Sequence, residues 1–169
     1  NITNDVAIGL RISIEAAEKT KLAYGFALAK EIPRREVFDL QEIDSSQKGE
    51  ICKRFLSEII EARLAEIFEI INNELKGLDH RVDLPAGAVI TGGGAKLPGI
   101  VDLARQELKL PVQIGLPELA NFDIKDPASQ ELISDPEFAT AVGLTICGLN
   151  QEGISHPSIL RRFLQSLIP

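Results

Sequence analysis

Residues 84–100 of the chain read LPAGAVITGGGAKLPGI, and this stretch decides the fold class. The apolar run at 86–91 predicts a short buried strand, and three glycines at 92–94 predict a loop. The pattern at 97–108 predicts a helix, and a second short strand is predicted at 112–114. Because the helix between them provides the crossover that parallel strands need, the sequence predicts an α/β fold with a parallel pair.

Helices are predicted on both sides of this unit. Asn4 is expected to cap a short helix through Leu10, and Ser13 to cap a second helix that ends at Gly25. Residues 26–46 fit short strands or irregular structure, and 136–149 fit a closing helix. From 47 to 75 the apolar residues recur every three or four positions, which predicts one long helix that ends at Gly77. Its predicted buried stripe comprises Leu56, Ile60, Leu64, Ile67, Ile71 and Leu75.

Composition excludes several classes of protein. The 169 residues include 18 basic and 25 acidic side chains, a net charge of −7, which argues against nucleic-acid binding. Two cysteines and two histidines build neither a zinc knuckle nor a disulfide framework, so a reducing, cytoplasmic compartment is expected. No apolar run approaches the length that spans a bilayer. The chain has no methionine and begins Asn1-Ile2-Thr3, so we expect the interior or C-terminal part of a longer polypeptide.

The glycine loop suits a ligand. Three glycines after a buried strand let the backbone approach a flat or charged molecule, and the N–H groups that open the next helix add a positive dipole end. The loop is neither a Walker P-loop nor a dinucleotide fingerprint, because the Lys-Ser/Thr ending and the required glycine spacing are missing. Taken alone, a glycine-rich turn between a strand and a helix is more often plain turn chemistry than a ligand site.

The same stretch resembles the adenosine motif of the actin-like ATPases, most closely that of the FtsA family. Residues 2–11, 111–117 and 138–144 resemble further FtsA landmarks in the same order. The resemblance implies the second lobe of an actin-like (ribonuclease-H-like) ATPase. We expect a nucleotide-facing subdomain at 1–12 and 85–153, a smaller inserted α+β subdomain at 13–84, and a tether with an amphipathic helix at 154–169.

The resemblance also implies an ATP site. Gly93, Gly94 and Lys96 occupy loop positions that approach the base, and Glu18 and Lys21 fall where relatives hold the ribose and base. Glu18 can accept ribose hydroxyl hydrogens, whereas the alternative is an ordinary surface ion pair. Both phosphate hairpins, with their Mg²⁺ ligands, are expected upstream. We therefore expect no catalytic or metal-binding residues here and no ATP hydrolysis by this segment.

The long helix carries charged residues on its outer face. Their simplest interpretation is a solvated face with ion pairs along the helix. The resemblance implies instead that the inserted subdomain receives the C-terminal peptide of the tubulin-like protein FtsZ, with Arg63 in the site, because arginine holds a carboxylate with two hydrogen bonds. The alternative is an intrahelical bridge from Arg63 to Glu66 or Glu69.

The end of the chain has helical amphipathicity. On a helical wheel, Arg161 and Arg162 lie opposite an apolar half, which is typical of an interfacial membrane helix. FtsA proteins are similar in this respect, whereas a helix docked on the domain's own core is the alternative. The predicted lipid-facing residues are Ile159, Leu160, Phe163, Leu164, Leu167 and Ile168.

Together with these features, the resemblance implies the C-terminal part of an ATP-binding actin-like cell-division adaptor. Such a protein polymerises and tethers the FtsZ filament to the inner face of the cytoplasmic membrane. The alternatives are a PilM-like pilus-assembly protein, which shares the glycine motif, and a lobe of a sugar-kinase-type phosphotransferase, which shares the architecture but leaves the tail unexplained.

Overall fold

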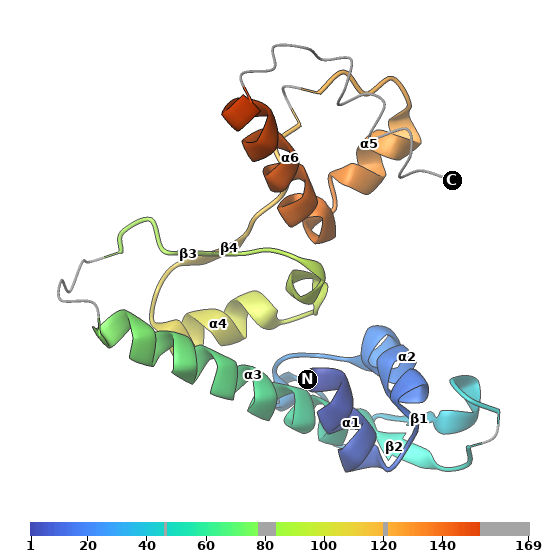
Figure 1. Ribbon diagram of the computed structural model, residues 1–169. Coiled ribbons are helices and arrows are strands. Elements are labelled where there is room, and N and C mark those ends of the chain that lie inside the picture. The colour runs from blue at the N-terminus through green and yellow to red at the C-terminus, as the bar shows by residue number, and fades with distance from the viewer. Residues whose placement is uncertain (46, 78–83, 120–121, 153–169) are drawn as a thin grey trace. The chain divides into compact units, whose positions relative to one another are not determined.

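The computed structural model describes residues 1–45, 47–77, 84–119 and 122–152 (Figure 1). They form two compact units, the first made of Asn1–Ala88 and Lys96–Gln113, the second of Val89–Ala95 and the residues from Ile114 onward. Helices and short strands alternate along the chain, in agreement with a mixed α/β composition. The division into actin-like subdomains, which rests on the resemblance, stays a prediction.

Two short helices open the first unit. Helix α1 spans Ile2–Leu10 and α2 spans Ile14–Tyr24. The Ser13 hydroxyl accepts the Ala16 N–H at 3.1 Å and Gly25 follows the last turn, so both predicted ends of α2 are confirmed.

The predicted start of α1 at Asn4 is wrong. Asn1 occupies the N-cap position without a side-chain cap, and its carbonyl accepts the Asp5 N–H at 3.1 Å. Asn4 is therefore already inside the first turn. The helix can begin earlier because the Asn1 carbonyl accepts the first backbone hydrogen bond and no side-chain cap is needed to start the helix.

A small hairpin precedes the long helix. Strands β1, Val37–Asp39, and β2, Glu50–Cys52, pair antiparallel with Phe38 opposite Ile51. Short 3₁₀ turns at Ala29–Glu31 and Leu40–Glu42 complete the irregular region that the sequence predicted. Because β2 occupies the start of the predicted 47–75 helix, helix α3 begins later, at Lys53, and ends at Gly77 as predicted.

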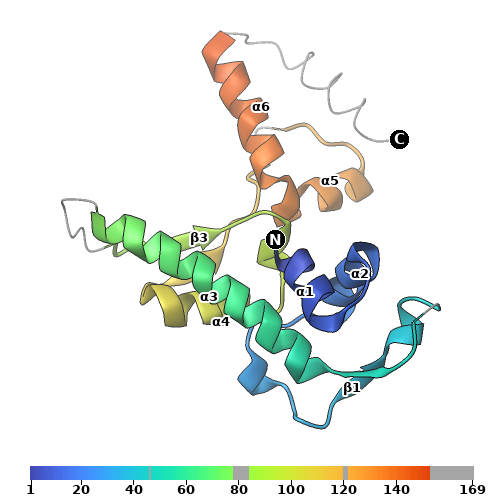
Figure 2. The ribbon, with the colours of Figure 1, turned by 60° about the horizontal axis from the view of Figure 1, so that its bottom comes forward.

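Helix α3 packs beside α4, Ile100–Leu108, and the two lie side by side in Figures 1 and 2. Leu56, Ile60 and Leu64 are buried as predicted. At Ile67 and Ile71 the prediction is wrong, since both are exposed and Phe68 is buried instead, and Leu75 is half-buried. The reason is that contact with the rest of the unit follows the row of every fourth residue. Further along this row, the Asn72 side-chain amide donates to the Glu107 carbonyl at 2.8 Å.

Strands β3, Ala88–Ile90, and β4, Val112–Ile114, form a second two-stranded sheet. The Ala88 N–H donates to the Pro111 carbonyl at 2.8 Å, and the Gly115 N–H donates to the Ile90 carbonyl at 2.8 Å. From the first bond to the second, the residue numbers rise on both strands, so the strands are parallel. The strand–loop–helix–strand unit that the sequence predicted is confirmed.

The described part of the second unit after Ile114 contains three helical elements. They are α5, Pro127–Ile133, a 3₁₀ turn at Pro136–Phe138 and α6, Ala139–Glu152. The closing helix was predicted from 136, whereas α5 was not predicted. Its start is well defined, because the Asp126 carboxylate accepts the Ser129 N–H at 2.9 Å and Pro127 occupies the first turn.

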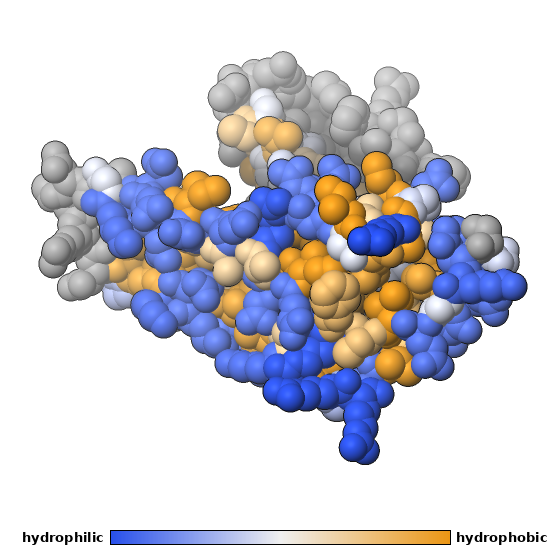
Figure 3. Space-filling view, turned by 90° about the horizontal axis from the view of Figure 1, so that it is seen from below, coloured by the Kyte–Doolittle hydropathy of each residue, from blue (hydrophilic) through white to orange (hydrophobic). Residues whose placement is uncertain are grey.

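Polar and apolar side chains alternate over the surface that Figure 3 presents. The first unit leaves single large apolar residues such as Ile8 and Leu22 exposed. None of the helices in the described part of the chain combines the length and the apolar character needed to span a bilayer. The predicted tether and amphipathic helix at 154–169 lie outside the described residues.

Candidate functional site

Glu18 and Lys21 lie three residues apart on α2, and the structure pairs them directly. Lys21 Nζ is 2.9 Å from Glu18 Oε1 and 2.7 Å from Oε2. The Thr3 hydroxyl, on α1, donates to Glu18 Oε2 and accepts from Lys21 Nζ at 3.1 Å. This Thr3–Glu18–Lys21 cluster therefore joins the first two helices of the first unit.

The cluster keeps Glu18 ionised and accessible. The hydrogen bond from Lys21, and then the one from Thr3, lower the pKa of the Glu18 carboxyl below its ordinary value. The Glu18 side chain is 43% exposed, whereas the Lys21 side chain is 21% exposed. The Glu18 carboxylate can thus be reached from solvent, whereas the Lys21 ammonium group is hydrogen-bonded to Glu18 and Thr3. A hydrogen-bond acceptor of this kind suits a ligand hydroxyl.

The glycine loop lies in the second unit, between β3 and a 3₁₀ turn at Gly93–Lys96. Gly92 has φ +88°, and its N–H donates to the Pro136 carbonyl at 2.9 Å, so the turn itself needs glycine there. The Thr91 hydroxyl lies 3.1 Å from the carbonyl oxygens of both Gly115 and Pro136. These bonds fix the entry of the loop.

Gly93 and Gly94 are different from Gly92. Neither has a positive φ. Among the described residues of this unit, a Cβ on Gly94 would meet nothing within 4 Å, and one on Gly93 would come only to 3.8 Å from Glu137. The local fold would therefore accept alanine at both positions. Two exposed glycines that the turn does not need agree with a loop that keeps space for a ligand.

The five residues predicted to bind nucleotide lie in both units. Glu18 and Lys21 form an ion pair in the first unit. The exposed Lys96 also lies in the first unit. Gly93 and Gly94 stand next to each other in the second. The structure brings Glu18 and Lys21 together, and the assembly of all five around a nucleotide stays a prediction. Thr3 was missed, because nothing in the spacing relates a residue of α1 to Glu18 fifteen positions later.

Arg63 of α3 is engaged within the chain. Its Nε and Nη2 atoms donate to the two Asp5 carboxylate oxygens at 2.5 and 2.8 Å, and Nη1 donates to Glu66 at 2.6 Å. The hydrogen bonds that Arg63 donates to Asp5 lower the pKa of the Asp5 carboxyl, and the same bonds raise the pKa of the Arg63 guanidinium. The predicted intrahelical bridge from Arg63 to Glu66 is present. The bidentate ion pair between Arg63 and Asp5 on α1 was not predicted from the sequence. Whether Arg63 also binds a partner stays a prediction.

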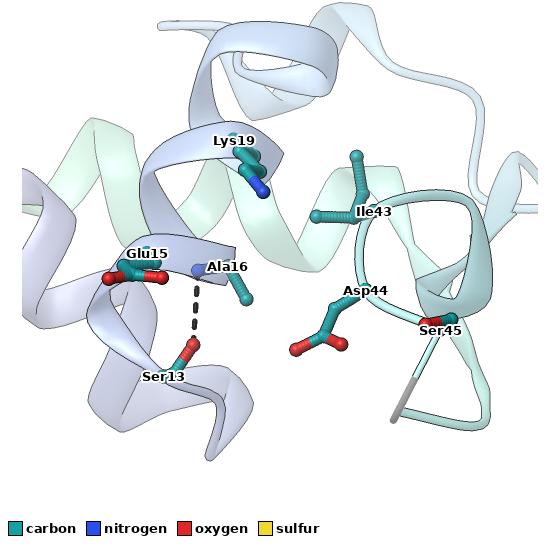
Figure 4. Close-up of a pocket in the computed structure, with 7 residues that line it drawn as sticks. All are labelled: Ser13, Glu15, Ala16, Lys19, Ile43, Asp44 and Ser45. Carbon is teal, nitrogen blue, oxygen red and sulfur yellow. Dashed lines mark hydrogen bonds between the residues drawn. The ribbon is translucent and has the colours of Figure 1, made fainter.

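A pocket of about 260 Å³ opens between the first turn of α2 and the segment after the second 3₁₀ turn (Figure 4). Lys19, Asp44 and Ser45 supply polar groups to it. None of the predicted site residues lines this pocket. Within the described ranges, histidine, cysteine and carboxylate side chains do not cluster in threes around any point that could hold a metal ion.

The predicted membrane-facing residues of the tail, between Ile159 and Ile168, lie outside the described residues. Their role stays a prediction.

The sequence matches the family model described as "Cell division protein FtsA" over residues 1–143. The chain belongs to the FtsA family. Cell division protein FtsA of Bacillus subtilis (strain 168) is 38% identical to it over 144 residues, which cover 85% of this chain and 30% of the relative. FtsA of Pseudomonas aeruginosa is 32% identical over 151 residues, 89% of this chain and 35% of that protein. FtsA of Streptococcus pneumoniae serotype 2 is 36% identical over 165 residues, which cover 94% of this chain and 35% of that protein.

The chain spans about a third of the length of these curated FtsA relatives. FtsA membership implies an actin-like fold and supports a role in cell division. The resemblance that the sequence predicted is therefore confirmed at the level of the family. It favours the FtsA interpretation over the PilM-like and sugar-kinase alternatives.

Proposed function

We propose that this chain is part of an ATP-binding, actin-like cell-division adaptor, which polymerises and holds the FtsZ filament at the cytoplasmic membrane. The family match supports the cell-division role. The observation that carries the nucleotide proposal is the Glu18 carboxylate, ionised, accessible and held by Lys21 and Thr3. The open space at Gly93 and Gly94 supports it independently.

In this proposal Glu18 accepts a hydrogen bond from the ribose, and the Lys21 stem packs against the nucleoside. The glycine loop gives the base room to approach the backbone. ATP would bring its Mg²⁺ ion to ligands outside this chain, and the chain itself contributes binding and not hydrolysis. Its own residues orient the nucleoside.

The test measures ATP affinity of the full-length protein. Gly93→Val places a branched side chain in the space proposed for the base, and affinity should fall by more than tenfold. Gly77→Val is the matched control, because Gly77, at the end of α3, also has no positive φ, and among the described residues a Cβ there would meet nothing within 4 Å. Equal affinities of Gly93→Val and the control, with both variants folded, would refute the assignment.

Arg63 is the residue we propose for the acidic C-terminal peptide of FtsZ. A guanidinium that already holds two carboxylates has the geometry that a third, from a peptide, would use in place of Glu66. Titration of the peptide should give a much weaker affinity for Arg63→Glu. Arg54→Glu is the control, since Arg54 lies on the same helix and pairs with Glu58 at 3.3 Å. Equal losses in both variants would indicate a general charge effect and no site at Arg63.

The tail is proposed to attach the protein to the inner face of the membrane. A helix of about ten residues is marginal in water, so it should form at the lipid surface and bind weakly as a single copy. Polymerisation would present many tails together and raise the effective concentration. In liposome sedimentation, Phe163→Asp should abolish binding, whereas Arg161→Glu/Arg162→Glu should weaken it mainly at low salt. Wild type that stays in the supernatant as monomer and as polymer would contradict the proposal.

A further inference from the structure

We infer that Thr3 is a positioning residue of the nucleotide site, whose hydroxyl fixes the Glu18 carboxylate so that Oε1 is presented to a ribose hydroxyl. The inference rests on the proposed function and deepens it. It assigns the selection of ribose to a specific oxygen atom, and it adds a residue from a helix that had no assigned role in ligand binding.

The hydrogen bonds of Glu18 single out this oxygen. Each carboxylate oxygen has two lone pairs. Oε2 accepts from the Thr3 hydroxyl and from Lys21 Nζ, so both of its lone pairs are used. Oε1 accepts from Lys21 alone among the described residues. One acceptor position therefore remains on the carboxylate, and it is on Oε1.

The hydrogen bonds of Lys21 lead to the same conclusion. Its ammonium group has three N–H donors, and the structure places Oε1, Oε2 and the Thr3 hydroxyl oxygen around it at 2.7–3.1 Å. No donor is left for a ligand. Hydroxyl recognition thus depends on Glu18, and Lys21 neutralises and holds it.

Thr3 is the rigid member of the cluster. Glu18 and Lys21 have long, rotatable side chains on the same helix, and a pair of this kind on its own fixes no single geometry. Threonine is short and β-branched, so its hydroxyl has few positions. Its helix is anchored, because the neighbouring Val6 is fully buried and Asp5 is bound to Arg63. The hydroxyl is therefore the fixed point from which the carboxylate is oriented.

The experiment compares the affinities of the full-length protein for ATP and for 2′,3′-dideoxyATP, which lacks the ribose hydroxyls. Thr3→Val keeps the shape of the side chain and removes the hydroxyl. It should weaken ATP binding by about tenfold, the scale of one hydrogen bond to a charged group, and change dideoxyATP binding by less than about twofold. Thr3→Ser keeps the hydroxyl and should retain the preference for ATP.

Two further variants make the result decisive. Thr3→Ala removes the hydroxyl in a second way and should reproduce the valine result, with thermal unfolding as the check on folding. Glu18→Ala tests the proposed function itself and should abolish the preference for ATP. If Glu18→Ala keeps the preference, the ribose assignment fails and the inference fails with it. If Glu18→Ala loses the preference but the two hydroxyl-free Thr3 variants keep it, or lose affinity for both nucleotides equally, the role of Thr3 is overturned and that of Glu18 stands.

Discussion

Replacing Thr20 by valine should make the protein more stable. Thr20 lies on α2, its side chain is fully buried, and its hydroxyl has no hydrogen-bond partner among the described residues. A buried polar group without a partner costs about 1–3 kcal/mol, and an added buried methyl group contributes about 0.8 kcal/mol. Valine has the same branched shape, so the helix loses nothing further. Allowing for partial relaxation of the site, we expect the free energy of unfolding to rise by about 1–2 kcal/mol.

Urea unfolding monitored by circular dichroism measures this change in the free energy of unfolding. The dependence of that free energy on urea concentration should be the same for wild type and variant, which checks two-state behaviour. Thr145→Val is the matched control, because the Thr145 hydroxyl donates to the Ala141 carbonyl at 2.8 Å and is satisfied. Its removal should bring no gain. Thr20→Ser keeps the hydroxyl, loses the methyl group and should destabilise by about 1 kcal/mol. A loss of stability in Thr20→Val would mean that the hydroxyl is bonded, and would refute the reasoning.

Three further predictions concern stability. The hydrogen bonds from Arg63 lower the pKa of the Asp5 carboxyl, so this ion pair stabilises the fold at pH values above the ordinary pKa of 3.8, and its contribution is lost as the pH falls below that value. The free energy of unfolding should therefore decline more steeply in acid for wild type than for Asp5→Asn. Parallel curves of stability against pH for the two proteins would contradict this. Gly87→Ala should cost more than about 2 kcal/mol, since φ is +75° and the new Cβ would lie 2.1 Å from the Pro111 carbonyl oxygen, whereas Gly94→Ala should leave thermal unfolding unchanged. Ser13→Ala should cost about 1 kcal/mol in urea unfolding through loss of the α2 cap, and no change would show that the cap contributes nothing.

Local signals predicted much of the fold. Ser13 and Gly25 bracket α2, Gly77 ends α3, and the strand–loop–helix order around 84–114 is present. Each of these depends on neighbours in the sequence, such as a cap, a glycine or an apolar period. The helix α5 was missed although Asp126 and Pro127 are a start signal, because the surrounding acidic segment lacks an apolar stripe.

The remaining differences arise from contacts between distant segments. Residues 50–52 became a strand because β1 offers them a partner, and no local pattern encodes that pairing. In the candidate site, the Glu18–Lys21 pair was predictable from its spacing on one helix. Thr3 and Asp5 were not, because each meets its partner only when α1 packs against α2 and α3.

The parallel pair β3–β4 has a practical consequence for anyone who produces this segment by itself. Parallel strands are normally covered on both faces, yet Val89, Ile114 and Leu116 are 58%, 41% and 65% exposed. In the part of the chain that the structure describes, no third strand joins β3 or β4. Free strand edges next to apolar side chains are templates on which a second molecule can add a strand. Concentrated samples of the segment should therefore self-associate through this sheet. Lysine in place of Val89 would be the first change to try for a better-behaved sample, since a charge on the strand opposes edge-to-edge pairing.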